Sequence, residues 1–222
     1  MAYVRVACLA DLHGFLPDVP ACDVLLLGGD LCPVADHEIH AQAEWLDGPF
    51  RAWLERLPAE EIAGIAGNHD FVFERAPGLL PADLPWVYLQ DHAETLGCGL
   101  KVWGSPWTPW FFDWAFNAPR ADSEGFLSTL YAKVPEDIDV LLVHGPPRGY
   151  GDRTMGGEHV GSVAQLELIE RVAPRACVFG HIHEGRGAWE LGPTQPTTQL
   201  VNAAAVDERY ELRAQPVVML EL

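Results

Sequence analysis

Residues 4–13 read VRVACLADLH, and this stretch decides the fold. The first seven are almost all apolar, and an apolar run of this length is typical of a buried strand. Asp11 and His13 follow directly where that strand ends. In extended backbone, residues i and i+2 point to the same face. The stretch therefore predicts a strand that directs a carboxylate and an imidazole toward one spot.

Four more apolar runs end in polar residues in the same way. The four motifs that follow these runs are Gly28-Gly29-Asp30, Gly67-Asn68-His69-Asp70, His144-Gly145 and Gly180-His181-Ile182-His183. In open α/β sheets, ligands gather just beyond the carboxyl ends of strands. Because all five motifs follow a predicted strand and have a glycine in or next to them, they predict one shared site.

The polar residues of these motifs are candidate metal ligands: Asp11, His13, Asp30, Asn68, His144, His181 and His183. Taken singly, His144 would be a structural histidine, and Asp30 and Asn68 would be turn residues. Together they offer oxygen and nitrogen donors and no sulfur. Such a set suits Mn, Fe, Zn, Co or Ni better than Mg or Ca alone.

The composition bounds the class of protein. A chain of 222 residues that is 49% hydrophobic is long enough for one domain over residues 1–222 and short for two. The net charge of −18 disfavours duplex DNA or long RNA as a partner. The apolar runs are too short to span a membrane, which needs about 20 residues. No signal peptide is visible, and nothing predicts an oligomeric state.

The cysteines point to a reducing compartment. Their number, five, is odd, and Cys8 and Cys177 lie inside apolar strand runs. They are interpreted as small buried apolar residues, without a disulfide framework or a thiolate zinc site. The sequence therefore predicts a cytoplasmic protein.

Strands and helices alternate along the chain in two halves. The predicted strands of the first half lie at 3–10, 23–28 and 62–66, and those of the second at 139–143, 176–179, 187–191, 198–202 and 217–222. Helical spacing covers 36–57, with a break at Gly48-Pro49, and also 122–132 and 163–172. Residues 86–104 suggest an antiparallel meander. We expect an α/β fold of four layers, αββα, in which two packed mixed sheets are flanked by helices.

At this point the sequence resembles the calcineurin-like metallophosphoesterases. Their signature is D-x-H, G-D, G-N-H-[DE], a histidine before glycine and G-H-x-H, and every block occurs here in order. The resemblance implies two divalent or trivalent transition-metal ions, with Mn, Fe or Zn favoured, and Asp30 shared between them. It assigns one ion to Asp11, His13, Asp30 and His183, and the other to Asp30, Asn68, His144 and His181.

A narrower resemblance rests on residues 104–111, 114–117, 144–147 and 179–185. These stretches look like the metallophosphoesterase-domain-containing branch, which is related to class III cyclic-nucleotide phosphodiesterases. Some animal members of that branch carry glycine at the position of His181, so histidine here favours a complete second metal site.

The resemblance also implies a mechanism. A hydroxide bridging two metal ions attacks the phosphorus of a small phosphodiester or nucleotide. His69, next to Asn68, is expected to protonate the leaving group, and Asp70 to orient His69. A phosphomonoesterase, including a protein phosphatase, is the alternative at the same site. A non-catalytic metal-binding scaffold ranks lower, because neither the ligands nor His69 are lost.

Several residues keep two interpretations at this stage. The aromatic stretch from Trp103 to Phe116 either packs over the sheet edge, which is favoured, or forms a wall on which a base stacks. Asn117 and Arg148 are favoured as solvated residues over phosphate contacts, and Asn202 is a candidate supporting residue near His183. The remaining histidines are assigned to loops or the surface: His37, His40, His92 and His159.

Overall fold

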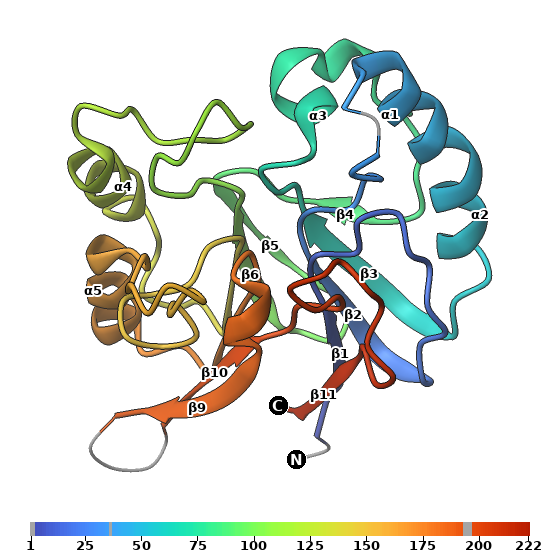
Figure 1. Cartoon of the computed structure of the whole chain (residues 1–222). Coiled ribbons are helices and arrows are strands. Elements are labelled where there is room, and N and C mark those ends of the chain that lie inside the picture. Colours follow the sequence, from blue (N-terminus) through green and yellow to red (C-terminus); the bar gives the residue numbers. More distant parts are fainter. Residues whose placement is uncertain (1–2, 36, 193–196) are drawn as a thin grey trace.

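Two sheets lie face to face in the computed structural model, with helices on the outer side of each (Figure 1). The structure describes residues 3–35, 37–192 and 197–222. The predicted αββα order of layers is confirmed. Near the start of the described chain, Val4 pairs with Leu222 at the C-terminus, which lies at the end of the molecule opposite α1 and α3.

The first sheet has the strand order β11-β1-β2-β3-β4. Its members are β1 (Arg5–Leu9), β2 (Cys22–Gly28), β3 (Ala59–Ile65), β4 (Val87–Tyr88) and β11 (Val218–Glu221). Strands β1 to β4 run parallel, and β11 is antiparallel to β1. The carboxyl ends of β1, β2 and β3 therefore meet at one edge.

The second sheet has the order β5-β6-β7-β8-β10-β9. Its four central strands are parallel, and the edge strands β5 and β9 are antiparallel to their neighbours. The strands are β5 (His92–Thr95), β6 (Lys101–Ser105), β7 (Val140–Val143), β8 (Ala176–Phe179), β9 (Gly187–Leu191) and β10 (Thr198–Asn202).

Helices cover the outer faces of both sheets. On the first sheet lie α1 (Ile39–Trp45), the π-helical turn Leu46–Phe50, α2 (Arg51–Leu54), α3 (Phe71–Arg75) and the 3₁₀ turn Pro77–Leu79. On the second lie α4 (Ser123–Tyr131) and α5 (Val163–Val172), and a 3₁₀ turn, His183–Gly185, follows β8. The break expected at Gly48-Pro49 is the π-helical turn between α1 and α2.

Alternation along β1 explains the layers. Val6 and Cys8 face the core between the two sheets, whereas Ala7 and Leu9 face the core under α1 and α2, and all four are fully buried. Successive side chains of a strand point to opposite faces, and a sheet covered on both sides needs apolar residues on both. A third core lies between the second sheet and helices α4 and α5.

The expected meander over residues 86–104 is wrong in its first part. Val87–Tyr88 pairs in parallel with β3 in the first sheet, and only β5 and β6 form an antiparallel pair. The physical reason is Gly64 of β3, because a Cβ there would lie 2.5 Å from the indole of Trp86. Glycine lets the Trp86 ring pack directly on β3, which holds the following two residues to the first sheet.

The cysteines are all free, and four of them are buried as expected. Cys98 is exposed, in the turn between β5 and β6, so the prediction of a buried thiol is wrong there. Two glycines flank Cys98, and no core element covers such a turn. Among the residues that the structure describes, no helix has both the length and the apolar character needed to cross a membrane.

Candidate metal centre

The candidate ligands come together at the carboxyl ends of five strands, three from the first sheet and two from the second. Asp11 and His13 follow β1, Asp30 follows β2, and Asn68 follows β3. His144 follows β7, and His181 and His183 follow β8. Six of these seven side chains are buried, and His181 is half-buried. The centre therefore lies where the two sheets face each other.

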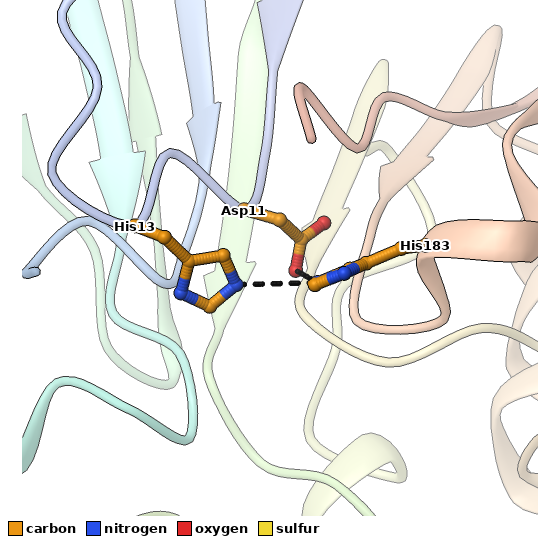
Figure 2. Close-up of side chains that lie close together, drawn as sticks. All are labelled: Asp11, His13 and His183. Atoms are coloured by element: carbon orange, nitrogen blue, oxygen red, sulfur yellow. Dashed lines mark hydrogen bonds and ion pairs between the residues drawn. The ribbon is translucent and has the colours of Figure 1, made fainter. Parts of the chain in front are cut away.

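Asp11, His13 and His183 form one side of the centre, here named the His13 end (Figure 2). Their donor atoms lie within 4.8 Å of one another. His13 Nε2 is 3.2 Å from His183 Nε2, and His183 Nε2 is 3.5 Å from Asp11 Oδ1. Three donors that converge this closely fit a single cation.

Asn68, His144 and His181 form the opposite side, here named the Asn68 end. Asn68 Oδ1 lies 2.8 Å from His144 Nε2 and 2.8 Å from His181 Nδ1. The amide oxygen and two imidazole nitrogens thus share one point in space, as they do around a metal ion that takes nitrogen and oxygen ligands.

Asp30 lies between the two ends. Its Oδ2 is 3.7 Å from His13 Nε2 and 3.5 Å from His144 Nε2. Its Oδ1 accepts a hydrogen bond of 2.8 Å from the backbone N–H of His69. One carboxylate oxygen therefore faces both groups of histidines, while the other is held by the backbone.

Hydrogen-bond directions show that these donors suit a cation. His144 Nδ1 lies 2.9 Å from the carbonyl oxygen of Gly28, and His183 Nδ1 lies 3.1 Å from that of Asp207. A carbonyl only accepts, so each Nδ1 carries the hydrogen and each Nε2 turns a lone pair toward oxygen atoms. Lone pairs facing each other at such distances are favourable only when a proton or a metal ion lies between them.

Burial and the charges of neighbouring ligands shift the pKa values of the histidines at the centre. Burial alone would lower the pKa of His144, but the negative charge of Asp30 outweighs it and raises that pKa to about 9. Burial lowers the pKa of His13 to about 4, and burial with the nearby His144 lowers the pKa of His181 to about 3. His13 and His181 are therefore neutral at pH 7, which is the form that binds metals.

Backbone conformation at the centre is unusual. Asp11, His13, Asp30 and His181 all have positive φ angles, of 52°, 46°, 53° and 69°. Residues with a Cβ adopt this left-handed conformation at a cost on the order of 1 kcal/mol each. Such conformations concentrate at functional sites, where the surrounding structure enforces them.

Glycines make room for the ligands. A Cβ on Gly180 would collide with the Asp11 carboxylate, and one on Gly67 would collide with Asp30. The backbone N–H of His181 donates to both Asp11 oxygens, at 2.9 and 3.0 Å. Gly180 and Gly67 are thus required by close approach, because a side chain at either position would displace a ligand.

Asp70 does not orient His69 as the sequence suggested. Its carboxylate accepts hydrogen bonds from the backbone N–H groups of Leu31, Cys32 and Gly67, at 2.8 to 3.1 Å. Burial and the nearby Asp30 raise the pKa of Asp70, while the three backbone donors oppose that rise. Asp70 therefore ties together the turns that carry Asp30 and Asn68.

The ring that contacts His69 belongs to His37, which the sequence assigned to a loop. His37 Nε2 lies 3.0 Å from His69 Nδ1. His37 precedes α1 and follows neither an apolar run nor a glycine, so no strand-end pattern marks it. Its position 32 residues before His69 became apparent only in three dimensions.

Asn202 supports the motif after β8, near His183 as expected. Its Nδ2 donates to the carbonyl oxygen of Ile182 at 2.9 Å, and its Oδ1 accepts from the N–H of Ala204 at 3.1 Å. Asn202 is fully buried. It fixes the peptide that lies between His181 and His183, one ligand from each end of the centre.

Asn117 has structural contacts where the sequence favoured a solvated side chain, whereas Arg148 is exposed as expected. Asn117 Nδ2 donates to the carbonyl oxygens of Phe111, Phe112 and Trp114, at 3.1 to 3.2 Å. Arg148 donates to the carbonyl oxygen of His159 at 2.9 Å. Asn117 thereby shapes the aromatic loop, which the sequence alone did not reveal.

A cavity of about 300 Å³ opens from the centre. Its walls combine Asp30, Asn68, His69, His181 and His183 with apolar or aromatic residues: Pro109, Trp110, Phe111, Trp114, Pro146, Val160, Ile182 and Tyr210. The residues of the aromatic stretch therefore have two different roles. Trp107 and Phe116 pack against each other, with ring centroids 5.6 Å apart, whereas Trp110, Phe111 and Trp114 line the cavity.

Known proteins resemble this chain in sequence. The family model described as calcineurin-like phosphoesterase matches residues 4–185. Metallophosphoesterase domain-containing protein 1 of Homo sapiens is 34% identical over 247 residues, which cover 98% of this chain and 71% of that protein. A UPF0046 protein of Caenorhabditis elegans is 30% identical to this chain, and the alignment covers 97% of this chain and 59% of that protein.

A solved structure shows the same fold. The phosphopantetheinyl hydrolase of Mycobacterium tuberculosis superposes with a TM-score of 0.63 at 15% identity, over 99% of this chain and 96% of that one. The family model matches residues 4–185, and a relative that aligns with 98% of this chain is 34% identical to it. The chain belongs to the calcineurin-like phosphoesterase family and is a metal-dependent phosphoesterase.

Proposed function

We propose that the protein hydrolyses small phosphodiesters, cyclic nucleotides among them, at a centre of two transition-metal ions. The observation that carries this proposal is the position of Asp30, whose Oδ2 lies 3.7 Å from a histidine of one end and 3.5 Å from a histidine of the other. One ion would be held by the His13 end and Asp30, and the other by the Asn68 end and Asp30. The mixed nitrogen and oxygen donors favour Mn, Fe or Zn.

The chain's own groups then divide the work of hydrolysis. A pair of bound transition-metal ions supplies Lewis acidity toward the phosphoryl group and lowers the pKa of water at the site. Asp11, Asp30 and the histidines fix where that acidity acts. His69 lines the cavity beside Asn68, and its Nε2 would give a proton to the leaving oxygen. Nδ1 of the same ring is occupied by His37.

The cavity walls support an organic substituent on the substrate. Trp110, Phe111 and Trp114 supply aromatic faces on which a base or another planar group can stack. Among the described residues that line the cavity, none is lysine or arginine. The phosphate that reacts is therefore neutralised at the metal centre, and further phosphate groups find no cationic side chain in these walls.

Overall charge supports a small substrate. With a net charge of −18, the surface repels long polyanions, and few basic residues are present to contact a phosphate backbone. We propose weak activity on long DNA that changes little with added salt, since the salt dependence of nucleic-acid binding reflects counterions released by basic residues.

The test is reconstitution of metal-free protein with one metal at a time: Mn²⁺, Zn²⁺, Fe²⁺ and Mg²⁺. Each form is assayed in parallel on bis(4-nitrophenyl) phosphate, 4-nitrophenyl phosphate, and 2′,3′- and 3′,5′-cyclic AMP. We expect Mn²⁺ among the best metals, hydrolysis of the nitrophenyl diester, and hydrolysis of at least one cyclic nucleotide. Elemental analysis should give two ions per chain.

The other outcomes are equally informative. Ready hydrolysis of monoesters with no activity on any diester would replace the phosphodiesterase by a phosphomonoesterase, including a protein phosphatase. Binding of two ions with no hydrolysis of either class would support a metal-binding scaffold. A single bound ion in the active protein would contradict the two-metal centre.

The aromatic wall has its own test within these assays. Phe111→Ala removes a ring that lines the cavity, and Phe15→Ala removes a comparably surface-exposed ring that does not. We expect Phe111→Ala to raise KM about tenfold for cyclic AMP, since stacking of a base contributes about 1–3 kcal/mol. Phe15→Ala should leave KM unchanged. Equal effects of the two variants would contradict stacking at Phe111.

A further inference from the structure

His37 and His69 form a contact that the metal centre itself does not require. His37 precedes α1, outside all five ligand motifs, yet its Nε2 lies 3.0 Å from His69 Nδ1. Its ring also packs near Phe71 and Trp114, with centroids 5.3 and 5.4 Å away. Two neighbouring rings therefore pack against the His37 imidazole while it faces His69.

The backbone of His69 is held separately from its ring. Its N–H donates to Asp30 Oδ1 at 2.8 Å, and its carbonyl oxygen accepts from Gln42 Nε2 at 2.7 Å. These two bonds place the residue but leave rotation of the side chain open. The ring packs on Trp114, with centroids 4.3 Å apart, and within the described residues its hydrogen-bond partner is His37.

We propose that His37 is a positioning residue that holds the imidazole of His69 so that His69 Nε2 faces the substrate cavity. The proposal rests on the proposed function, in which His69 protonates the leaving oxygen. His37 Nε2 accepts a hydrogen bond from His69 Nδ1–H, so the proton that moves is confined to Nε2 of His69. When that proton passes to the leaving oxygen, the Nδ1–H bond to His37 is unchanged.

An imidazole partner differs in one respect from a carboxylate. The imidazole of His37 can accept the Nδ1–H hydrogen bond at Nε2 without bringing a further carboxylate to a centre that already holds Asp30 and Asp11. It also packs against Phe71 and Trp114, so it restricts His69 more than a solvated partner would. A general acid contributes only when its proton lies within hydrogen-bond reach of the leaving oxygen. Loss of His37 should therefore slow the reactions that need that proton.

The test compares two substrates with the Mn²⁺-loaded protein. Bis(4-nitrophenyl) phosphate releases nitrophenolate, which needs no proton, whereas 2′,3′-cyclic AMP releases a ribose alkoxide, which does. We expect His37→Phe to lower kcat for the cyclic nucleotide about 10- to 100-fold, the scale of a displaced catalytic group. KM, metal content and the nitrophenyl reaction should change less than about threefold.

Two further variants separate positioning from packing. His37→Gln should recover most of the rate, because its amide oxygen can accept from His69 Nδ1–H, while His37→Asn is too short to reach and should behave like His37→Phe. His40→Gln is the matched control, since His40 is a nearby exposed histidine paired with Glu38. The double variant His37→Phe/His69→Ala should be no slower than His69→Ala alone, as expected for groups that act as one unit.

The outcomes that overturn the inference are distinct from those that overturn the function. If His69→Ala slows the cyclic nucleotide reaction but His37→Phe and His37→Asn do not, His37 has no positioning role and the proposed function stands. Equal losses on both substrates, or multiplied losses in the double variant, also exclude action through His69. If His69→Ala itself leaves the alkoxide reaction unchanged, the acid role in the proposed function fails instead.

Discussion

The two ends of the metal centre differ in charge more than in geometry. Each offers two imidazoles and shares Asp30, but the His13 end adds the carboxylate of Asp11 where the Asn68 end adds a neutral amide. One extra negative charge strengthens binding of a cation, and most strongly at a buried site. We therefore expect the His13 end to bind its ion more tightly, and a chelator to remove the ion of the Asn68 end first.

Asp30→Ala should have the largest effect, because this residue serves both ends. We expect loss of measurable hydrolysis and of more than one ion per chain, measured by elemental analysis. Asp18→Ala, at an exposed aspartate, is the control and should keep both. Retention of two ions by Asp30→Ala would contradict the shared position, and with it any comparison of two ends joined by one carboxylate.

His69→Ala tests whether hydrolysis needs a general acid in addition to the two ends of the metal centre. The variant should keep two ions and a native far-UV circular dichroism spectrum, since His69 belongs to neither end. Its rate on a poor leaving group should fall roughly 10²–10⁴-fold, the usual contribution of a general acid. With a nitrophenolate leaving group the loss should be small. Rates that fall equally across a leaving-group series would show that His69 supports binding or structure instead.

Asp11→Asn removes the charge that distinguishes the ends. The asparagine oxygen can still accept from His181 N–H, so the turn should hold. The affinity of the His13 end should fall by at least the roughly 10–100-fold that loss of a group behind a ligand costs, because Asp11 is itself a ligand of that end. Calorimetric titration of metal-free protein with Mn²⁺ should show two phases for the natural chain and closely similar affinities for the variant. A natural chain that binds both ions with one affinity would refute the predicted difference.

Asn202→Ala should have the smallest effect and should touch both ends alike. It leaves the carbonyl oxygen of Ile182 and the N–H of Ala204 without their buried partner. We expect the free energy of unfolding to fall by about 1–3 kcal/mol, the cost of an unsatisfied buried group. Denaturant titration measures this loss. A decrease in metal affinity at one end only would show that the peptide between His181 and His183 is fixed by other contacts.

Much of the centre could be predicted because its signals are local. Each ligand follows an apolar strand, and parallel strands bring their carboxyl ends to one edge, so Asp11, Asp30 and Asn68 needed no contact information. The same logic predicted β8 and the pair His181 and His183 after it. The layers followed from apolar residues on both faces of β1, as in Val6 and Ala7.

The missed features depend on partners far away in the chain. His37 contacts a residue 32 positions later in the chain. The carboxylate oxygens of Asp70 accept hydrogen bonds from the backbone N–H groups of Leu31 and Cys32, nearly 40 positions earlier. A carboxylate next to a histidine suggests a side-chain pair, but three buried N–H groups are stronger competitors for it. Val87 and Tyr88 joined the first sheet because Gly64 accepts the ring of Trp86, a contact without any periodic signal.

The left-handed backbone at four of the candidate ligands also bears on how this protein can change over time. Asp11, His13, Asp30 and His181 each oppose folding by an amount that glycine would relieve. Selection for hydrolysis must therefore maintain these side chains against a backbone cost of that order. A lineage released from that selection should acquire glycine first at His13, whose Nδ1 is buried without a partner among the described residues. It should acquire glycine last at Asp11 and Asp30, whose carboxylates accept hydrogen bonds from the backbone N–H groups of His181 and His69.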